Sequence, residues 1–119
     1  MTSKRIRHLE LTEEAFELIA ARFRVLAEPM RLRLLHALGG DEVTVGQLVR
    51  ATGGGQANVS KHLAILLDAG IVRRRKEGLN VYYRVLDETI FEICEIVCDS
   101  IGERLATQRT AIKNYPARS

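Results

Sequence analysis

The sequence predicts a mainly α-helical protein with one β-hairpin, on three observations. Apolar residues recur at the three- and four-residue spacing of amphipathic helices over most of the chain. Residues 71–86 depart from that spacing, because the β-prone runs IVRRRK and VYYRVL flank the turn-forming EGLN. Helical spacing resumes after Asp87. The predicted order is therefore four helices, a hairpin and a last helix.

Length and composition limit the class of protein. The chain has 119 residues, and we expect residues 1–119 to form a single domain with 1–10 and 114–119 as flexible arms. Its 46% apolar and 28% charged residues are typical of a soluble globular protein. No run approaches the roughly 20 apolar residues that cross a membrane, and the N-terminus lacks the apolar run of a secretory signal. We therefore expect a cytoplasmic protein that does not bind membranes.

Capping residues mark the starts of three short helices before residue 54. Thr12 is expected to cap the first helix, which extends to about residue 27, and Pro29 fits the first turn of the second. Thr44 and Gln47 have the spacing of a capping box, which starts a third helix that ends at Gly53. The apolar stripe of the second helix is expected to contain Leu32, Leu35 and Leu38.

The fourth helix, expected from about Gln56 to Ala69, places its hydrogen-bonding residues before its leucines. Helical spacing turns Val59, Leu63, Leu66 and Leu67 inward, turns Ala57, Asn58 and Lys61 outward, and leaves His62 on the flank. A recognition helix enters the major groove of DNA by its N-terminal end, so its polar residues must come first. An ordinary solvated face is the alternative. With the hairpin, the pattern predicts a winged helix-turn-helix.

The hairpin carries Arg73, Arg74, Arg75 and Lys76 beside a glycine turn. Such charges can protect a sheet edge, but edge protection needs only one or two of them, whereas a basic tip can lie along a minor groove or its phosphates. Strand alternation sends Arg74 to the face opposite Arg73 and Arg75, so not all three arginines can touch DNA.

The segment ANVSKHLAILLDAGIVRRRKEGLNVYYRV, with LAEPMRLRLLHAL upstream, resembles the core of the ArsR/SmtB family of winged-helix repressors from Leu26 to Leu86. The resemblance implies an obligate homodimer, formed mainly by the first and last helices, that binds a near-palindromic double-stranded operator and releases it when an inducer binds. It also implies DNA contacts from the start of the fourth helix, where Ala57 replaces a common serine and can meet a thymine methyl. The expected DNA-contacting residues are Gln56, Ala57, Asn58, Ser60, Lys61, His62, Arg73, Arg75, Lys76 and Asn80.

Two inducer sites of that family are not expected here. Thr44 and Gly46 stand where many members carry a cysteine pair at the start of the third helix. Another group binds zinc across the last helices, and Asp87 and Glu103 match its carboxylates. Thr89 and Ser100 stand where its histidines would be, and two carboxylates without imidazole make a poor zinc site.

Cys94 and Cys98, one helical turn apart, are the remaining candidate sensor. Both thiols point the same way, so one thiophilic metal or metalloid ion can bridge them, and a reactive sulfur species is another candidate inducer. Such an ion is the candidate cofactor, and His8 is one candidate for its third ligand. Alternatively, the cysteines are packing residues of the dimer interface. That interface is expected to contain Phe16, Ile90, Cys94, Val97 and Ile101.

These features predict a homodimeric transcriptional repressor whose partners are DNA and a second copy of the chain. One alternative is a winged-helix repressor without metal sensing, and another is a winged-helix module that docks a protein. An enzyme is not expected, because the sequence has no C-x-x-C, no βαβ pattern and no base paired with a nucleophile.

Overall fold

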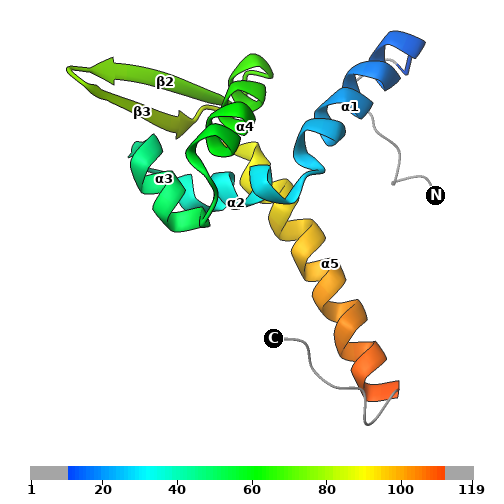
Figure 1. Cartoon of the computed structure of the whole chain (residues 1–119). Coiled ribbons are helices and arrows are strands. Elements are labelled where there is room, and N and C mark those ends of the chain that lie inside the picture. The colour runs from blue at the N-terminus through cyan, green and yellow to red at the C-terminus, as the bar shows by residue number, and fades with distance from the viewer. Residues whose placement is uncertain (1–10, 112–119) are drawn as a thin grey trace. The chain divides into compact units, whose positions relative to one another are not determined.

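The computed structural model describes residues 11–111, with the side chains of residues 11–106. The predicted arms, 1–10 and 114–119, lie outside this range. The chain divides into two compact units, Met1–Leu86 and Asp87–Ser119, and its single-domain organisation stays a prediction. The elements in Figure 1 are α1 (Glu13–Leu26), α2 (Pro29–Leu38), β1 (Val43–Thr44), α3 (Val45–Thr52), α4 (Gln56–Asp68), β2 (Val72–Glu77), β3 (Asn80–Val85) and α5 (Thr89–Ala111).

The predicted helix starts are confirmed at the level of individual hydrogen bonds. The Thr12 hydroxyl accepts from the backbone N–H of Ala15, and Pro29 is the first residue of α2. Thr44 and Gln47 form the reciprocal capping box at the start of α3. Because caps are made by residues three or fewer positions apart, they can be read from sequence alone.

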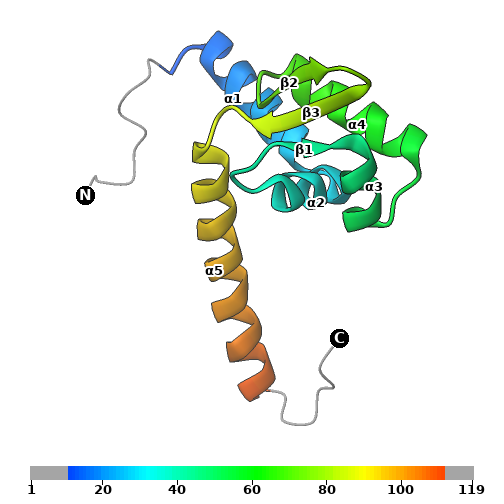
Figure 2. The ribbon, with the colours of Figure 1, turned by 90° about the vertical axis from the view of Figure 1, so that its left-hand side faces the viewer.

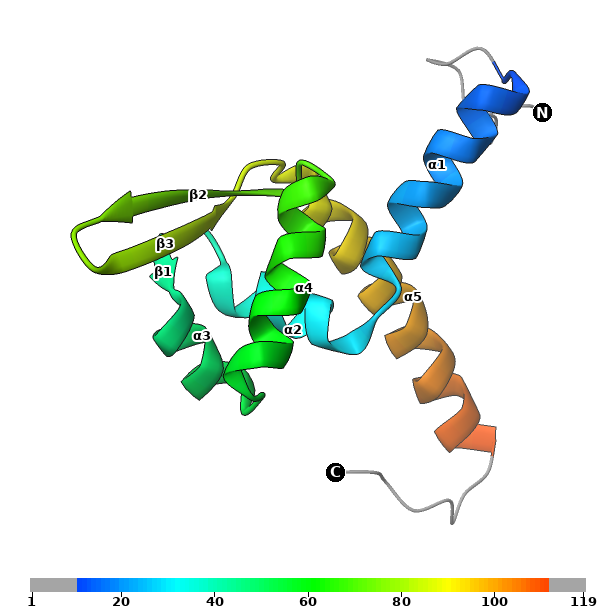
Figure 3. The same cartoon turned by 45° about the horizontal axis from the view of Figure 1, so that its top comes forward.

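The core of the first unit lies between α2, α3, α4 and the sheet. Leu34, Leu35 and Leu38 of α2 are buried, whereas Leu32 is 40% exposed. The predicted stripe of α2 was therefore wrong at one position. The interior also receives Leu48 of α3 and Val59, Leu63 and Leu66 of α4. In Figure 3, α3 and α4 are joined by a short turn, and the hairpin extends beyond the helices.

A third strand, β1, was not predicted. Its two residues pair antiparallel with β3, Val43 with Tyr83 and Thr44 with Tyr82, and the sheet order is β1-β3-β2. Figure 2 shows β1 beside the hairpin, directly before α3. Two residues are too few to show strand periodicity, and Thr44 is at the same time the N-cap of α3.

The register of the hairpin sorts its side chains between two faces. Arg73 pairs with Arg84 and Arg75 with Tyr82, while Arg74 pairs with Tyr83. The expected separation of Arg74 from its two neighbours is confirmed, because directly paired residues share a face of the sheet. Tyr83 is only 7% exposed, so the face that carries Arg74 is the one that packs on the core.

In the second unit, α5 begins two residues after Asp87, whose carboxylate accepts hydrogen bonds from the backbone N–H and the hydroxyl of Thr89. The helix continues to Ala111. Within residues 11–111, no helix is both long enough and apolar enough to cross a bilayer.

Candidate nucleic-acid interface

The turn between α3 and α4 is built from three glycines with different roles. Gly53 ends α3 with a φ of 74°, in the left-handed region that glycine adopts without strain. Gly54 approaches the core so closely that a Cβ there would lie 2.9 Å from Cε of Met30 and 3.1 Å from Cγ2 of Val59. Gly55 is the N-cap of α4 and provides no side-chain hydrogen bond to the helix. The first backbone N–H groups of α4 are therefore not capped by a side chain and can meet an anion.

The first two turns of α4 present the polar surface that the sequence predicts. The exposed residues there are Gln56, Ala57, Asn58, Ser60 and Lys61. They surround the uncapped helix start, while Val59 in the same turns is fully buried. The helix is therefore fixed by one face and offers the other to a partner.

His62 does not belong to this exposed set. Its side chain is 7% exposed, and its Nδ1 lies 3.0 Å from Nη1 of Arg31 on α2. The prediction that His62 contacts DNA is therefore wrong for the described structure. Residues 59, 62, 63 and 66 form one inward stripe at helical spacing, so the spacing itself could have placed this histidine among the leucines.

Arg75 is exposed but already held by acidic partners. Its Nε and Nη2 donate to the two carboxylate oxygens of Glu42 at 3.0 and 2.8 Å, and its Nη1 donates to Oε1 of Glu77 at 2.8 Å. The guanidinium also lies over the ring of Tyr82, with its carbon 4.9 Å from the centroid. The hydrogen bond from Arg75, against the opposing effect of burial, lowers the pKa of Glu42. Sequence reasoning missed Glu42 because it is 33 positions away.

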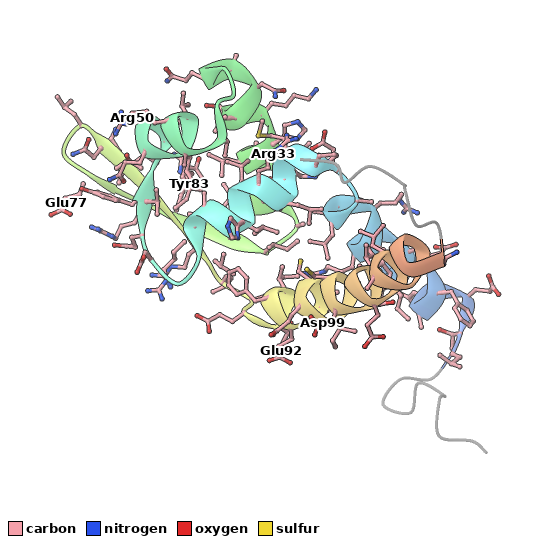
Figure 4. All side chains as sticks on the ribbon, turned by 90° about the horizontal axis from the view of Figure 1, so that it is seen from below. Arg33, Arg50, Glu77, Tyr83, Glu92 and Asp99 are labelled. Carbon is pink, nitrogen blue, oxygen red and sulfur yellow. The ribbon has the colours of Figure 1, made fainter. Side chains whose placement is uncertain are left out.

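The other predicted hairpin contacts, Arg73, Lys76 and Asn80, are exposed. Leu79 in the turn is fully exposed. Figure 4 shows Glu77 projecting from the hairpin, whereas Tyr83 lies between the sheet and the helices. The far part of the hairpin, residues 73–80, is therefore exposed. Its acidic residue, Glu77, is paired with Arg75, which it shares with Glu42.

The predicted sensor and interface residues are distributed over both units. Cys94 is half-buried, Cys98 is exposed, and both are free thiols. Phe16 on α1 and Val97 and Ile101 on α5 are each about half exposed, whereas Ile90 is buried. Among the described residues no group of three or more histidine, cysteine, aspartate or glutamate side chains could hold a metal ion. His8 lies outside the described residues. On α5, Figure 4 shows Glu92 and Asp99 projecting from the helix.

A helix with an uncapped polar start, packed on two shorter helices beside a basic hairpin, defines a winged helix-turn-helix protein. Residues 26–75 match the family described as helix-turn-helix domain. The chain is 37% identical over 81 residues to the transcriptional repressor SmtB homolog of Synechocystis, which covers 68% of this chain and 61% of that protein. It is 32% identical over 91 residues to the regulator KmtR of Mycobacterium tuberculosis, covering 76% of this chain and 68% of that protein.

A solved structure supports the same assignment. The antimony-specific transcriptional repressor AntR superposes with a TM-score of 0.73 at 32% identity, covering 89% of this chain and 99% of that chain. The protein therefore belongs to the ArsR/SmtB family of winged-helix transcriptional regulators, which act by binding DNA and not by catalysis. The resemblance noted in the sequence is confirmed.

Proposed function

We propose that the protein is a homodimeric transcriptional repressor that binds a near-palindromic operator through α4 and the β2–β3 hairpin. The observation that carries the proposal is the exposed surface at the uncapped start of α4, formed by Gln56, Ala57, Asn58, Ser60 and Lys61. A helix start of this kind brings side chains to base edges and backbone N–H groups to a phosphate at once. Repression, as distinct from activation, is proposed because the SmtB homolog and AntR are repressors.

The hairpin is proposed to contact the adjacent DNA backbone through Arg73 and Asn80 on one face of the sheet and through Lys76, near the turn, on the face that also carries Arg74. These three side chains are exposed, and two are cationic. Phosphate contacts fix the position of a protein on the duplex, whereas the base contacts of α4 select the sequence. Arg75 is expected to support the hairpin rather than to bind phosphate, since Glu42 and Glu77 already accept its hydrogen bonds.

Two copies of the chain are needed to read a two-fold symmetric site. Half-exposed apolar residues are available for a dimer interface on each unit, namely Phe16 on α1 and Val97 and Ile101 on α5. Cys94 is proposed to lie in the same interface. Such a dimer places two recognition helices about one turn of DNA apart. We expect it to act in the cytoplasm.

The test is binding to a duplex selected from a random library, measured by fluorescence anisotropy at several salt concentrations. Lys61→Ala is expected to weaken binding and to flatten the plot of log affinity against log salt by about 0.9, the value for one phosphate contact. Arg33→Ala removes an equal charge from an exposed position of α2 and serves as the control. Selection of no preferred sequence, or equal losses in the two variants, would contradict the proposal.

The inducer is proposed to be a thiophilic metal or metalloid ion, or a reactive sulfur species, that acts at Cys94 and Cys98. Their four-residue spacing puts both thiols on one side of α5, and Cys98 is open to solvent. The likeness to AntR, an antimony-specific repressor, favours a soft ion over a hard one. Two thiols do not complete a tetrahedral site, so further ligands must come from a second copy or from outside the described residues.

A further inference from the structure

Arg31 joins three helices through one guanidinium group. Its Nε donates to the backbone carbonyl of Val25 at 2.6 Å, and its Nη2 donates to that of Arg24 at 3.4 Å. Both carbonyls belong to the last turn of α1. Its Nη1 points the other way and donates to Nδ1 of His62 on α4 at 3.0 Å. A single side chain of α2 therefore connects the end of α1 with the recognition helix.

The contact with Arg31 selects the tautomer of a neutral His62 ring. A guanidinium has only donors, so Nδ1 must accept and the neutral ring carries its proton on Nε2. Nε2 faces Oε1 of Glu28 at 3.9 Å. The same Oε1 accepts from the backbone N–H groups of Met30 and Arg31 at 2.7 and 3.2 Å, which holds the carboxylate at the start of α2. The imidazole is thus hydrogen-bonded on one side to Arg31 and faces the carboxylate of Glu28 on the other.

His62 directly follows the exposed surface of residues 56–61 and lies on the opposite face of the same helical turns. Since α4 has no side-chain cap, contacts along its inner face help to hold the helix, and among them His62 makes a polar contact in addition to the buried apolar residues. Without His62, Nη1 of Arg31 would lose its acceptor, and without Arg31, Nδ1 of His62 would lose its donor. Either group would then be left part-buried and unsatisfied.

We propose that Arg31 and His62 are positioning residues, which fix the orientation of α4 relative to the end of α1 without touching DNA. The inference rests on the proposed function, because it assigns the operator-binding geometry to a hydrogen bond inside the protein. It also means that a displacement of the last turn of α1 is transmitted to the recognition helix by one side chain.

The test compares His62→Asn, whose Oδ1 can accept in place of Nδ1, with His62→Leu, which has no acceptor. His62→Leu is expected to bind the selected operator about 10-fold more weakly than the wild type, which is the effect of losing one buried hydrogen bond. The slope of log affinity against log salt stays that of the wild type, because no phosphate contact is lost. His62→Asn recovers most of the affinity. Wild-type affinity in His62→Leu, or a salt slope reduced as in Lys61→Ala, would overturn the proposal.

A double-mutant cycle tests whether Arg31 and His62 act through one shared link, with His62→Asn as the control for folding. Arg31→Lys keeps the charge but replaces the separate nitrogens that reach α1 and α4 with a single one, and it is expected to weaken binding as His62→Leu does. The double variant should be no weaker than either single one, since both remove the same link. If the fold loss of operator affinity in the double variant equals the product of the two single losses, the two residues act independently and the inference is refuted.

Amide hydrogen exchange separates this inference from the proposed function, because it needs no DNA. Exchange at residues 56–62 should accelerate in His62→Leu and not in His62→Asn. If the wild type binds no duplex, the proposed function fails, and the exchange result alone decides the role of His62. Unchanged exchange in His62→Leu would refute it.

Discussion

The guanidinium of Arg75 on β2 reaches across the central strand β3 to the carboxylate of Glu42, which precedes β1, with N–O distances of 3.0 and 2.8 Å. On its way it covers the ring of Tyr82. The pair therefore ties the two outer strands of the sheet together over the middle one. Arg75 is one of the cations that composition assigns to DNA binding. In the structure it stabilises the hairpin instead.

Removal of Glu42 should release Arg75 from its two-pronged pair and leave only the exposed Glu77 as its acidic partner. Glu42→Ala is expected to strengthen operator binding at low salt and to steepen the salt dependence by up to about 0.9, because Arg75 becomes available to one phosphate. Asp41→Ala removes an equal charge from the neighbouring exposed position without releasing Arg75, and it should leave the slope unchanged. Anisotropy titrations at four or five salt concentrations distinguish them. Identical slopes for both variants would show that Arg75 does not contact a phosphate even when Glu42 is removed.

Gly54 is predicted to tolerate no side chain. In Gly54→Ala the new Cβ meets Cε of Met30 and Cγ2 of Val59 at 2.9 and 3.1 Å, so the end of Met30 must move and Val59 must give way. We expect a loss of about 1 to 3 kcal/mol in the free energy of unfolding, measured by urea denaturation, together with weaker operator binding. Gly55→Ala is the matched control, because nothing lies within 4 Å of its Cβ position. Equal stability of the two variants would contradict the close approach.

Acid should destabilise the protein through Glu28 and Glu42. Burial raises the pKa of Glu28, but hydrogen bonds from the backbone N–H groups of Arg31 and Met30 outweigh it, so both carboxyl groups have a pKa below the ordinary 4.5. A lowered folded-state pKa stabilises the fold above pH 4.5, and this contribution is lost as pH falls from there through the folded value. The melting temperature of the wild type should therefore decline as pH falls below 4.5. In the double variant Glu28→Gln/Glu42→Gln the decline should be less steep. A decline that is as steep in the double variant would exclude these carboxylates as its cause.

Val97→Glu is predicted to separate the homodimer. Val97 is 49% exposed on α5, and a charge there cannot be buried against a second copy without a large penalty. Ultracentrifugation should show a monomer, and operator affinity should fall at the same time because two half-sites require two linked helices. Glu92→Gln, on the same helix, is the control and should remain dimeric. A dimeric Val97→Glu would place the interface elsewhere.

The cysteine pair is predicted to carry the inducer response. Antimonite, arsenite, cadmium, copper(I) or a persulfide donor should release operator from the wild type, with a coupling of about 1 to 3 kcal/mol, and not from Cys94→Ser or Cys98→Ser. Ligation of thiolates releases protons, so for the metal and metalloid ions the response should weaken as pH falls below the thiol range. Release that is as efficient in both serine variants would reduce the cysteines to packing residues.

The sequence alone determined the helix starts and the hairpin, whereas the family came from its resemblance to known repressors. Thr12, Thr44 and Gln47 bond to neighbours three positions away, and the period of apolar residues is set within a single helix or strand. The polar start of α4 was readable for the same reason. These features are local, so composition and spacing contain them.

Only the tertiary structure decided which polar residues are free to meet DNA. His62 and Arg75 resemble DNA contacts by type and position, yet each is bound to a partner more than 30 positions away, Arg31 in one case and Glu42 in the other. The strand β1, which follows Glu42 and pairs with β3, was equally hidden, since two residues have no period. Such pairings form when packing brings distant segments together, and no spacing along the chain records them.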